Sequence, residues 1–273
     1  MLRIIDARTG EPVPAAPVRR GLARVEVHAP GHGTGALRVL LVADLLVRAL
    51  ELGGTPVVAL LAGGRERAEL RAAAAALGVR PFEEGPELAG GIGSARALHV
   101  VGEADTAGGA VAPVLPDQAG DAVAPVLPEE GGDAVAPVLS DEVRVAVAPV
   151  VPDAPVASDA DPAVLRLALL SHHHREPVPL DAEGLGAARD TLARWRRAVA
   201  EWARRPSKPV PEDVKERLRT AWEDDLDVPG VLGVLRWVEE AGPELPDGAR
   251  FETYAYADRL LGLELTRDLG AWA

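Results

Sequence analysis

Cysteine is absent from all 273 residues of the sequence. Its absence excludes disulfide bonds and metal sites built from thiolates, and nothing else in the composition indicates export from the cell. Lysine is nearly absent: the only two are Lys208 and Lys215. The first 207 residues therefore offer no lysine that could contact a phosphate.

Long apolar runs are missing as well. A transmembrane helix needs roughly 20 consecutive apolar residues, and no run in this sequence reaches that length. Charged residues also interrupt the opening segment, MLRIIDARTGEPV, where a signal peptide needs an apolar core. We therefore expect a cytoplasmic protein with no membrane partner.

The net charge of −13 is unevenly distributed. Residues 101–160 hold one arginine and 11 acidic residues, a net charge of −10, whereas residues 1–100 hold 12 arginines and 10 acidic residues, a net charge of +2. Most of the acidity thus comes from one segment. Outside it, the composition neither supports nor forbids a polyanionic partner.

Residues 24–58 carry the pattern of a βαβ unit. A short strand includes Val25, Val27 and the residues before Pro30, and a glycine-rich loop covers 31–35. Apolar residues recur at helical spacing over 37–52, and the apolar run at 55–61 is typical of a buried parallel strand. A loop that opens a helix presents backbone N–H groups and the positive end of the helix dipole to an anion. The candidate nucleotide-binding residues are His32, Gly33, Thr34 and Gly35.

Further elements around this unit complete an α/β fold. Short strands are predicted at 2–5 and 97–102 and a helix at 65–77, which together indicate an abridged Rossmann-like domain with a parallel sheet over residues 1–107. The glycine loop also fits NAD(P)-binding patterns. However, the second strand leads into 61–65 without the acidic residue that would hold a ribose, and this weighs against a dinucleotide.

Residues 108–155 contain an internal repeat in which the motif AVAPV recurs every 12 residues. A short β-solenoid is one interpretation, but a proline interrupts the apolar run of each unit and removes a hydrogen-bond donor. We favour an extended, polyproline-like acidic linker over residues 108–160. Such a linker is a candidate site for a basic protein partner.

Residues 161–273 have a helical pattern and predict an α-helical bundle. Helices are expected at 163–173, 180–203, 210–224, 229–241 and 251–263. Asp161, Asp181 and Asp227 are predicted N-caps, two of them followed by proline at the first helical position. The triplet His172-His173-His174 is interpreted as structural, because consecutive helical residues point about 100° apart and do not face one ion.

The helical half also carries a family resemblance. DPAVLRLALLSHHHREPVPLDAEGLGAARDTLARWRRAVA, LRTAWEDDLDVPGVLGVLRWV and YADRLLGLEL resemble the C-terminal region of the cysteinyl-tRNA synthetase family of class I synthetases. They are most similar to its shorter members, which ligate cysteine to glucosaminyl-inositol. The resemblance covers residues 161–265 and, more loosely, the opening strand and the helix of the βαβ unit. It implies an ATP-dependent aminoacyl ligase.

The sequence departs from this family at the positions that carry its chemistry. The family binds the substrate thiol through zinc held by cysteine, histidine and glutamate. Here His28 stands where the first cysteine is expected, so His28 becomes the candidate substrate contact and zinc is not expected. The HIGH motif aligns with residues 33–36 and loses both histidines, and no KMSKS-like segment exists. No catalytic residue is assigned.

Three hypotheses follow. The first is a degenerate ligase-like paralogue with weak or no ATP-dependent activity, because losing charges that stabilise the phosphates removes most adenylation. The second is an active ATP-dependent ligase with an altered substrate. The third is a non-enzymatic interaction module whose acidic repeat recruits a basic partner. The resemblance admits tRNA as a partner, but no residue supports it.

Overall fold

The computed structural model describes residues 1–16, 21–29, 31, 33–62, 68–83, 96–103, 142–152 and 161–270. The strands are β1 (Arg3–Ile5), β2 (Pro12–Pro14), β3 (Ala23–His28), β4 (Val57–Leu61), β5 (Arg96–Gly102), β6 (Glu142–Val147), β7 (Val150–Val151) and β8 (Val178–Pro179). The helices are α1 (Thr34–Leu52), α2 (Ala68–Ala76), α5 (Pro162–Leu170), α6 (Ala182–Trp202), α7 (Glu212–Glu223), α8 (Val228–Glu240) and α9 (Asp247–Leu261). No helix among these is long and apolar enough to cross a membrane.

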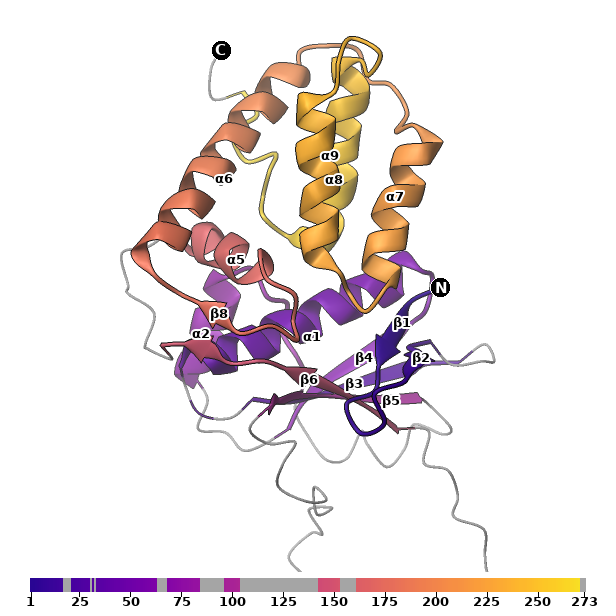
Figure 1. The fold of residues 1–273 in the computed structure, drawn as a ribbon, viewed down its shortest axis with the longest axis vertical. Coiled ribbons are helices and arrows are strands. Elements are labelled where there is room, and N and C mark those ends of the chain that lie inside the picture. The colour runs from indigo at the N-terminus through magenta and orange to yellow at the C-terminus, as the bar shows by residue number, and fades with distance from the viewer. Residues whose placement is uncertain are drawn as a thin grey trace, which may run out of the picture.

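The central sheet has four parallel strands in the order β4-β3-β5-β6 (Figure 1). This arrangement confirms the predicted Rossmann-like α/β architecture. Side chains of β3 alternate between buried and half-buried positions, as expected when one face of a strand covers the core. The buried face carries Ala23, Val25 and Val27, and the opposite face carries Arg24, Glu26 and His28.

Strand β6 corrects part of the linker prediction. Residues 142–147, assigned from the sequence to the acidic linker, pair in parallel with β5 and form an edge of the sheet. The pattern EVRVAV is compatible with a strand, because its three valines alternate with other residues, and pairing with β5 buries them to at most 2% exposure. The proline of this repeat unit, Pro149, follows the strand and does not interrupt it. Residues 108–141 lie outside the described part of the chain.

Helix α1 lies between the sheet and the C-terminal helices (Figure 1). Fifteen of its 19 residues are buried, which is the pattern of a helix covered on more than one side. Strands β3, β5 and β6 pack on one side of it, and α9 packs on another. One continuous hydrophobic core therefore contains both Val25 of the sheet and Leu232 of the helical part.

The predicted helix caps are present. Asp161, Asp181 and Asp227 each accept a hydrogen bond from a backbone N–H two or three residues later, at 2.8–3.0 Å. Helix α5, however, ends at Leu170 and not at 173. The chain turns there because Ala148 N donates to the carbonyl oxygen of His174, which joins this loop to the end of β6.

The N-terminal hairpin of β1 and β2 lies along the free edge of β6. Ala7 N donates to Arg144 O at 2.8 Å, and Asp6 Oδ1 accepts from Arg144 N at 3.2 Å. At its other end, Asp225 N donates to Arg3 O at 2.9 Å. The hairpin thus ties the sheet to the junction between α7 and α8.

Candidate functional site

The order of the strands defines where a ligand would bind. The chain passes from β3 through α1 to β4 on one side, while β5 pairs with β3 on the other side. The carboxyl ends of β3 and β5 therefore flank a topological switch point, the usual position of ligands in open α/β sheets. His28, the last residue of β3, stands at this point, and the glycine loop follows it.

The glycine-rich segment leads into α1, which begins at Thr34, three residues before the start predicted from the sequence. Gly33 is the N-cap of α1, Thr34 and Gly35 begin its first turn, and Gly31 has a left-handed φ of 68°. Gly33 itself has no side chain with which to cap the helix, and Thr34 is only 1% exposed. His32 lies outside the described residues. A glycine-containing turn thus leads into the first turn of a helix, whereas nucleotide binding by these residues stays a prediction.

Three polar side chains meet beside the switch point on the half-buried face of the sheet. The distance from His28 Nε2 to His99 Nδ1 is 3.2 Å, from His99 Nδ1 to Glu26 Oε2 is 3.3 Å, and from His28 Nε2 to Glu26 Oε2 is 4.0 Å. The two imidazole rings are stacked with centroids 5.5 Å apart. Their convergence follows from the register, because Glu26 and His99 are directly paired between β3 and β5.

The surroundings of His99 favour its neutral form. Burial lowers the pKa of His99 below its ordinary value, although the neighbouring Glu26 carboxylate acts in the opposite direction. Arg24 Nε lies 2.9 Å from Glu26 Oε1 and leaves Oε2 directed at the histidines. The cluster can therefore accept a cation or exchange a proton.

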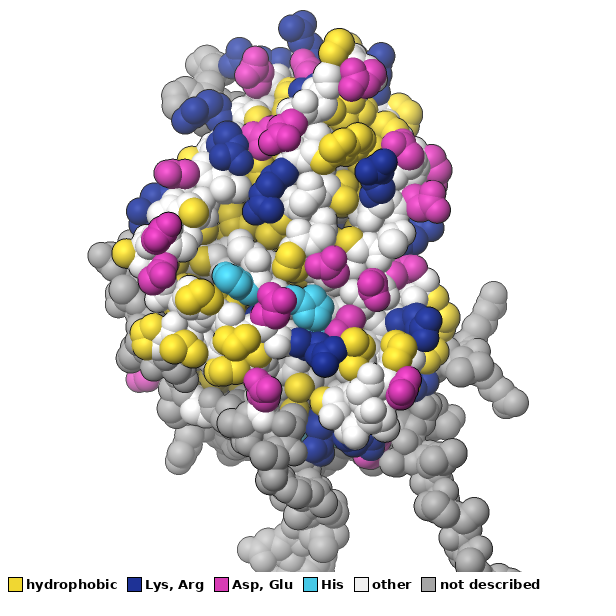
Figure 2. Space-filling view, in the orientation of Figure 1, with side chains coloured by type: hydrophobic (Ala, Val, Ile, Leu, Met, Phe, Trp, Pro, Cys, Tyr) yellow, Lys and Arg dark blue, Asp and Glu magenta, His cyan; other side chains and the backbone are white. Residues whose placement is uncertain are grey.

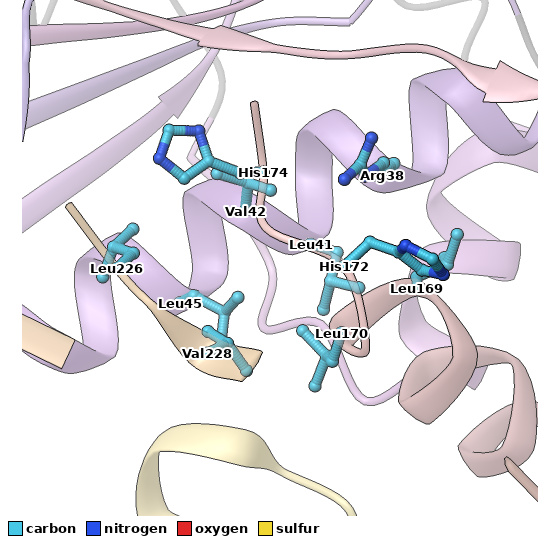
Figure 3. Close-up of a pocket in the computed structure, with 10 residues that line it drawn as sticks. All are labelled: Arg38, Leu41, Val42, Leu45, Leu169, Leu170, His172, His174, Leu226 and Val228. Carbon is cyan, nitrogen blue, oxygen red and sulfur yellow. The ribbon is translucent and has the colours of Figure 1, made fainter. Parts of the chain in front are cut away.

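Two hollows elsewhere do not provide a nucleotide site. An apolar cavity between α1, α5 and the start of α8 has a volume of about 10 Å³, which is room for about one water molecule (Figure 3). Arg38 and His174 are among its lining residues. A shallow groove of about 560 Å³ beside α7 is lined by four carboxylates and one arginine. The charged residues of this groove are Asp213, Glu216, Arg217, Asp224 and Asp227. The net negative charge of the groove repels phosphate.

Two residues of the histidine triplet, His173 and His174, form a structural junction. His173 and His174, which lie past the end of α5, converge on Asp225: each directs Nε2 at its carbonyl oxygen, at 3.0 and 2.9 Å. The Nδ1 atom of His174 faces Ala146 O at 3.1 Å, and Nδ1 of His173 accepts from Arg175 N at 3.3 Å. All four ring nitrogens of these two residues therefore face backbone atoms, which supports a structural role for His173 and His174.

Charge is mixed on the surface of the helical part. On the face shown in Figure 2, acidic and basic side chains are interspersed over the helices and no broad patch of one sign is visible. Binding to a nucleic acid backbone depends on clustered positive charge. That face therefore gives no support to a tRNA partner.

Sequence reasoning identified His28 but missed Glu26 and His99. The available signal was the alternation of both strands, which places Glu26 and His28 on the same face of β3. Their partner His99 lies 71 residues beyond His28, and only the strand register brings the two together.

Fold and site together define a Rossmann-like α/β protein in which a glycine-rich loop lies at the topological switch point of a parallel sheet.

No family model matches the chain. It is similar to curated proteins named L-cysteine:1D-myo-inositol 2-amino-2-deoxy-alpha-D-glucopyranoside ligase. The relative from Streptosporangium roseum is 42% identical over 110 residues, covering 39% of this chain and 26% of the relative. The relative from Stackebrandtia nassauensis is 41% identical over 117 residues, covering 41% of this chain and 26% of the relative.

These relatives confirm the resemblance to the cysteine ligases. A third, from Streptomyces griseus, is 41% identical over 108 residues and bears the same name. The chain spans about a quarter of the length of the relatives it matches. It is therefore ligase-like, and its match to these ligases is partial.

Proposed function

We propose that the chain is a reduced relative of the ATP-dependent cysteine ligases, which keeps the scaffold of the nucleotide loop and has weak or no ligase activity by itself. The relatives are named for joining L-cysteine to an amino sugar linked to inositol. Identity near 40% supports common descent with them. The βαβ unit at the switch point supports retention of the framework on which such a reaction takes place.

The engagement of two arginines carries this proposal. Arg24 and Arg38 flank the glycine loop, and in a region without lysine they are the groups nearest in sequence that could neutralise a triphosphate. Arg24 is paired with Glu26 at 2.9 Å, and Arg38 donates to Ala148 O at 2.6 Å and His173 O at 2.7 Å. Burial lowers the pKa of Arg38 to about 10, still high enough to keep its charge at neutral pH. Both cations are thus used within the fold.

Because basic groups are not available to contact the phosphates, we expect a low rate of adenylation. One positioned group that stabilises transition-state charge is commonly worth about 100-fold to 1000-fold in turnover. A site whose basic groups serve the fold instead should have little adenylation activity.

Pyrophosphate exchange tests this expectation. The full chain, incubated with ATP, cysteine and labelled pyrophosphate, is expected to give no exchange above the protein-free background. Exchange that depends on cysteine and disappears in His28→Ala would overturn the proposal, because it would show a working adenylation site.

The retained loop favours a second candidate, an active ATP-dependent ligase with a different substrate. In that case Gly33, Thr34 and Gly35 would hold phosphate through their backbone, and His28 and His32 would be polar contacts. Calorimetry with millimolar ATP decides this alternative. Absence of any binding heat would remove it, whereas saturable binding together with exchange driven by another amino acid would establish it.

A further inference from the structure

The cluster of Glu26, His28 and His99 has the composition and spacing of a metal site. Two imidazoles and one carboxylate form a common ligand set for zinc and for other first-row divalent ions. One ligand atom from each residue can be chosen so that all three lie within 4.8 Å of one another. These atoms are Glu26 Oε2, His28 Nε2 and His99 Nδ1.

The distances within the cluster match tetrahedral coordination. Ligand atoms that lie about 2.0–2.1 Å from a tetrahedral zinc ion are about 3.3–3.4 Å from one another. Two of the three observed separations, 3.2 and 3.3 Å, agree with this value, and the third is 4.0 Å. Only a small rotation of the Glu26 or His28 side chain would bring the third into range. The backbone already sets the geometry, because Glu26 and His99 are register partners.

In this cluster, three polar atoms that are able to bind a cation point toward one another. A ring nitrogen of His28 meets a ring nitrogen of His99, and a carboxylate oxygen meets the same atom of His99. A carboxylate accepts hydrogen bonds only, and a neutral imidazole has one N–H. His99 Nδ1 can carry at most one proton for its contacts with His28 Nε2 and Glu26 Oε2, whereas a divalent ion can bind all three atoms together.

The environment supports binding in one further way. Arg24 lies against Oε1 of Glu26 and fixes the orientation of the carboxylate while Oε2 remains directed at the histidines. Such outer contacts commonly position the residues that bind a metal.

The second histidine cluster, in the loop after α5, differs because its ring nitrogens already contact the backbone. His173, His174 and Asp225 also lie within ligand distance of one another. There, however, three ring nitrogens face carbonyl oxygens and the fourth accepts a backbone N–H. Coordination of an ion would break these hydrogen bonds, so this cluster is not a comparable candidate.

We propose that Glu26, His28 and His99 bind one divalent first-row transition-metal ion through Oε2, Nε2 and Nδ1, with a further coordination position open to water or a small ligand. The zinc site implied by the family resemblance needs cysteine, which this chain lacks. Glu26 and His99 are instead contributed by paired residues of the sheet itself. The inference does not depend on the proposed loss of ligase activity.

Metal titration of the full chain tests the site. Protein without a polyhistidine tag is treated with a chelator, and zinc and cobalt(II) are then titrated by calorimetry and visible absorption. We expect one equivalent of either ion to bind, with the intense visible bands of low-coordinate cobalt. Absence of saturable binding at millimolar zinc would overturn the proposal.

Matched variants locate the site. His99→Ala and Glu26→Gln should each weaken zinc binding by about 100-fold or more, since even the loss of an outer contact costs about 10-fold to 100-fold. His172→Ala, a histidine outside the cluster, should leave the affinity unchanged. Stoichiometric binding that persists in both cluster variants, or that is lost in the control, would contradict the assignment.

A measurement on the wild-type chain avoids reliance on variants that fold poorly. Diethyl pyrocarbonate modifies accessible imidazole, and mass spectrometry reports which histidines react. Zinc should slow the modification of His28 and leave that of His172 unchanged. Equal rates at His28 with and without zinc would count against the site even if zinc binds elsewhere.

Discussion

Asp44 is a buried carboxylate that accepts hydrogen bonds from three arginines. Arg48 and Arg80 donate from Nε at 2.8 and 3.0 Å, and Arg166 donates from a terminal nitrogen at 3.1 Å. The side chains of Asp44 and Arg166 have no exposed surface. Arg166 also donates to carbonyl oxygens at the ends of α2 and α9, so the group joins α1, α5 and α9.

Removing this carboxylate should destabilise the whole fold. Asp44→Ala leaves Arg166 as a buried charge without its counterion, and we expect a loss of about 3–5 kcal/mol in the free energy of unfolding. Urea denaturation measures this loss. The control is Glu51→Ala, which removes an exposed partner of Arg80 and should cost at most about 1 kcal/mol. Equal losses in both variants would show that Asp44 has no special role.

The same carboxylate should make stability depend on acidic pH. Burial alone would raise the pKa of Asp44, but the charges of Arg166 and Arg48 and the hydrogen bonds from Arg80 and Arg166 outweigh it and lower the pKa below its ordinary value. A lowered folded-state pKa means that the ionised group stabilises the protein above the unfolded value of about 3.9. That stabilisation disappears as the pH falls through the folded-state pKa.

Comparison with Asp44→Asn isolates this effect from other titrating groups. The difference in unfolding free energy between wild type and variant should be constant from about pH 7 to pH 5 and should shrink below about pH 4. Urea titrations at several pH values give this difference. A difference in unfolding free energy that stays the same down to pH 3 would be inconsistent with a lowered pKa of Asp44.

At the scale of elements, helix α6 offers a direct test of the capping prediction. Asp181 accepts from Gly184 N at 2.8 Å and satisfies one of the free N–H groups at the helix start. Asp181→Ala should lower the unfolding free energy by about 1 kcal/mol. Asp190→Ala, an exposed position within the same helix, should change it by about 0.5 kcal/mol or less. A cost for Asp190→Ala equal to that for Asp181→Ala would contradict the cap.

Local signals explain why most elements were predictable. An aspartate before proline, as at Asp161 and Asp227, specifies a helix start through contacts within four residues. The end of α5 was not predictable in this way. It depends on the hydrogen bond from Ala148 to His174, and residue 148 reaches that loop only after β6 has joined the sheet.

At the scale of the molecule, we expect the fold to need one part of the repeat and not another. Deleting residues 108–131, two complete repeat units, leaves 15 residues between the end of β5 at Gly102 and the start of β6 at Glu142, and a parallel crossover needs about a dozen. We expect the unfolding free energy to change by about 1 kcal/mol or less. Thermal and urea unfolding should stay cooperative.

A deletion of equal length further along the repeat is the matched comparison. Removing residues 132–155 eliminates β6 and β7 together with Val143, Val145 and Val147. Each buried valine is worth about 1.5–3 kcal/mol, so their combined loss is comparable to the total stability of a typical domain. This variant should not unfold cooperatively. Equal stability of the two deletions would contradict the place of β6 in the core.

The first deletion also tests the hypothesis that the acidic repeat recruits a basic partner. Removal of residues 108–155 would confuse partner loss with unfolding, because it takes away β6. The shorter deletion, 108–131, leaves the described fold intact and removes acidic repeat units. Unchanged capture of a basic partner by this variant would count against the hypothesis.

The sequence by itself determined the local elements: the βαβ unit, the glycine loop, the capped helices and the resemblance to the cysteine ligases. Each depends on residues close together in the chain, where periodicity and capping are read directly. Only the tertiary structure decided that residues 142–147 join the sheet and that Glu26, His28 and His99 meet. Those outcomes depend on strand register, a pairing between residues about 40 to 70 positions apart, which no local pattern specifies.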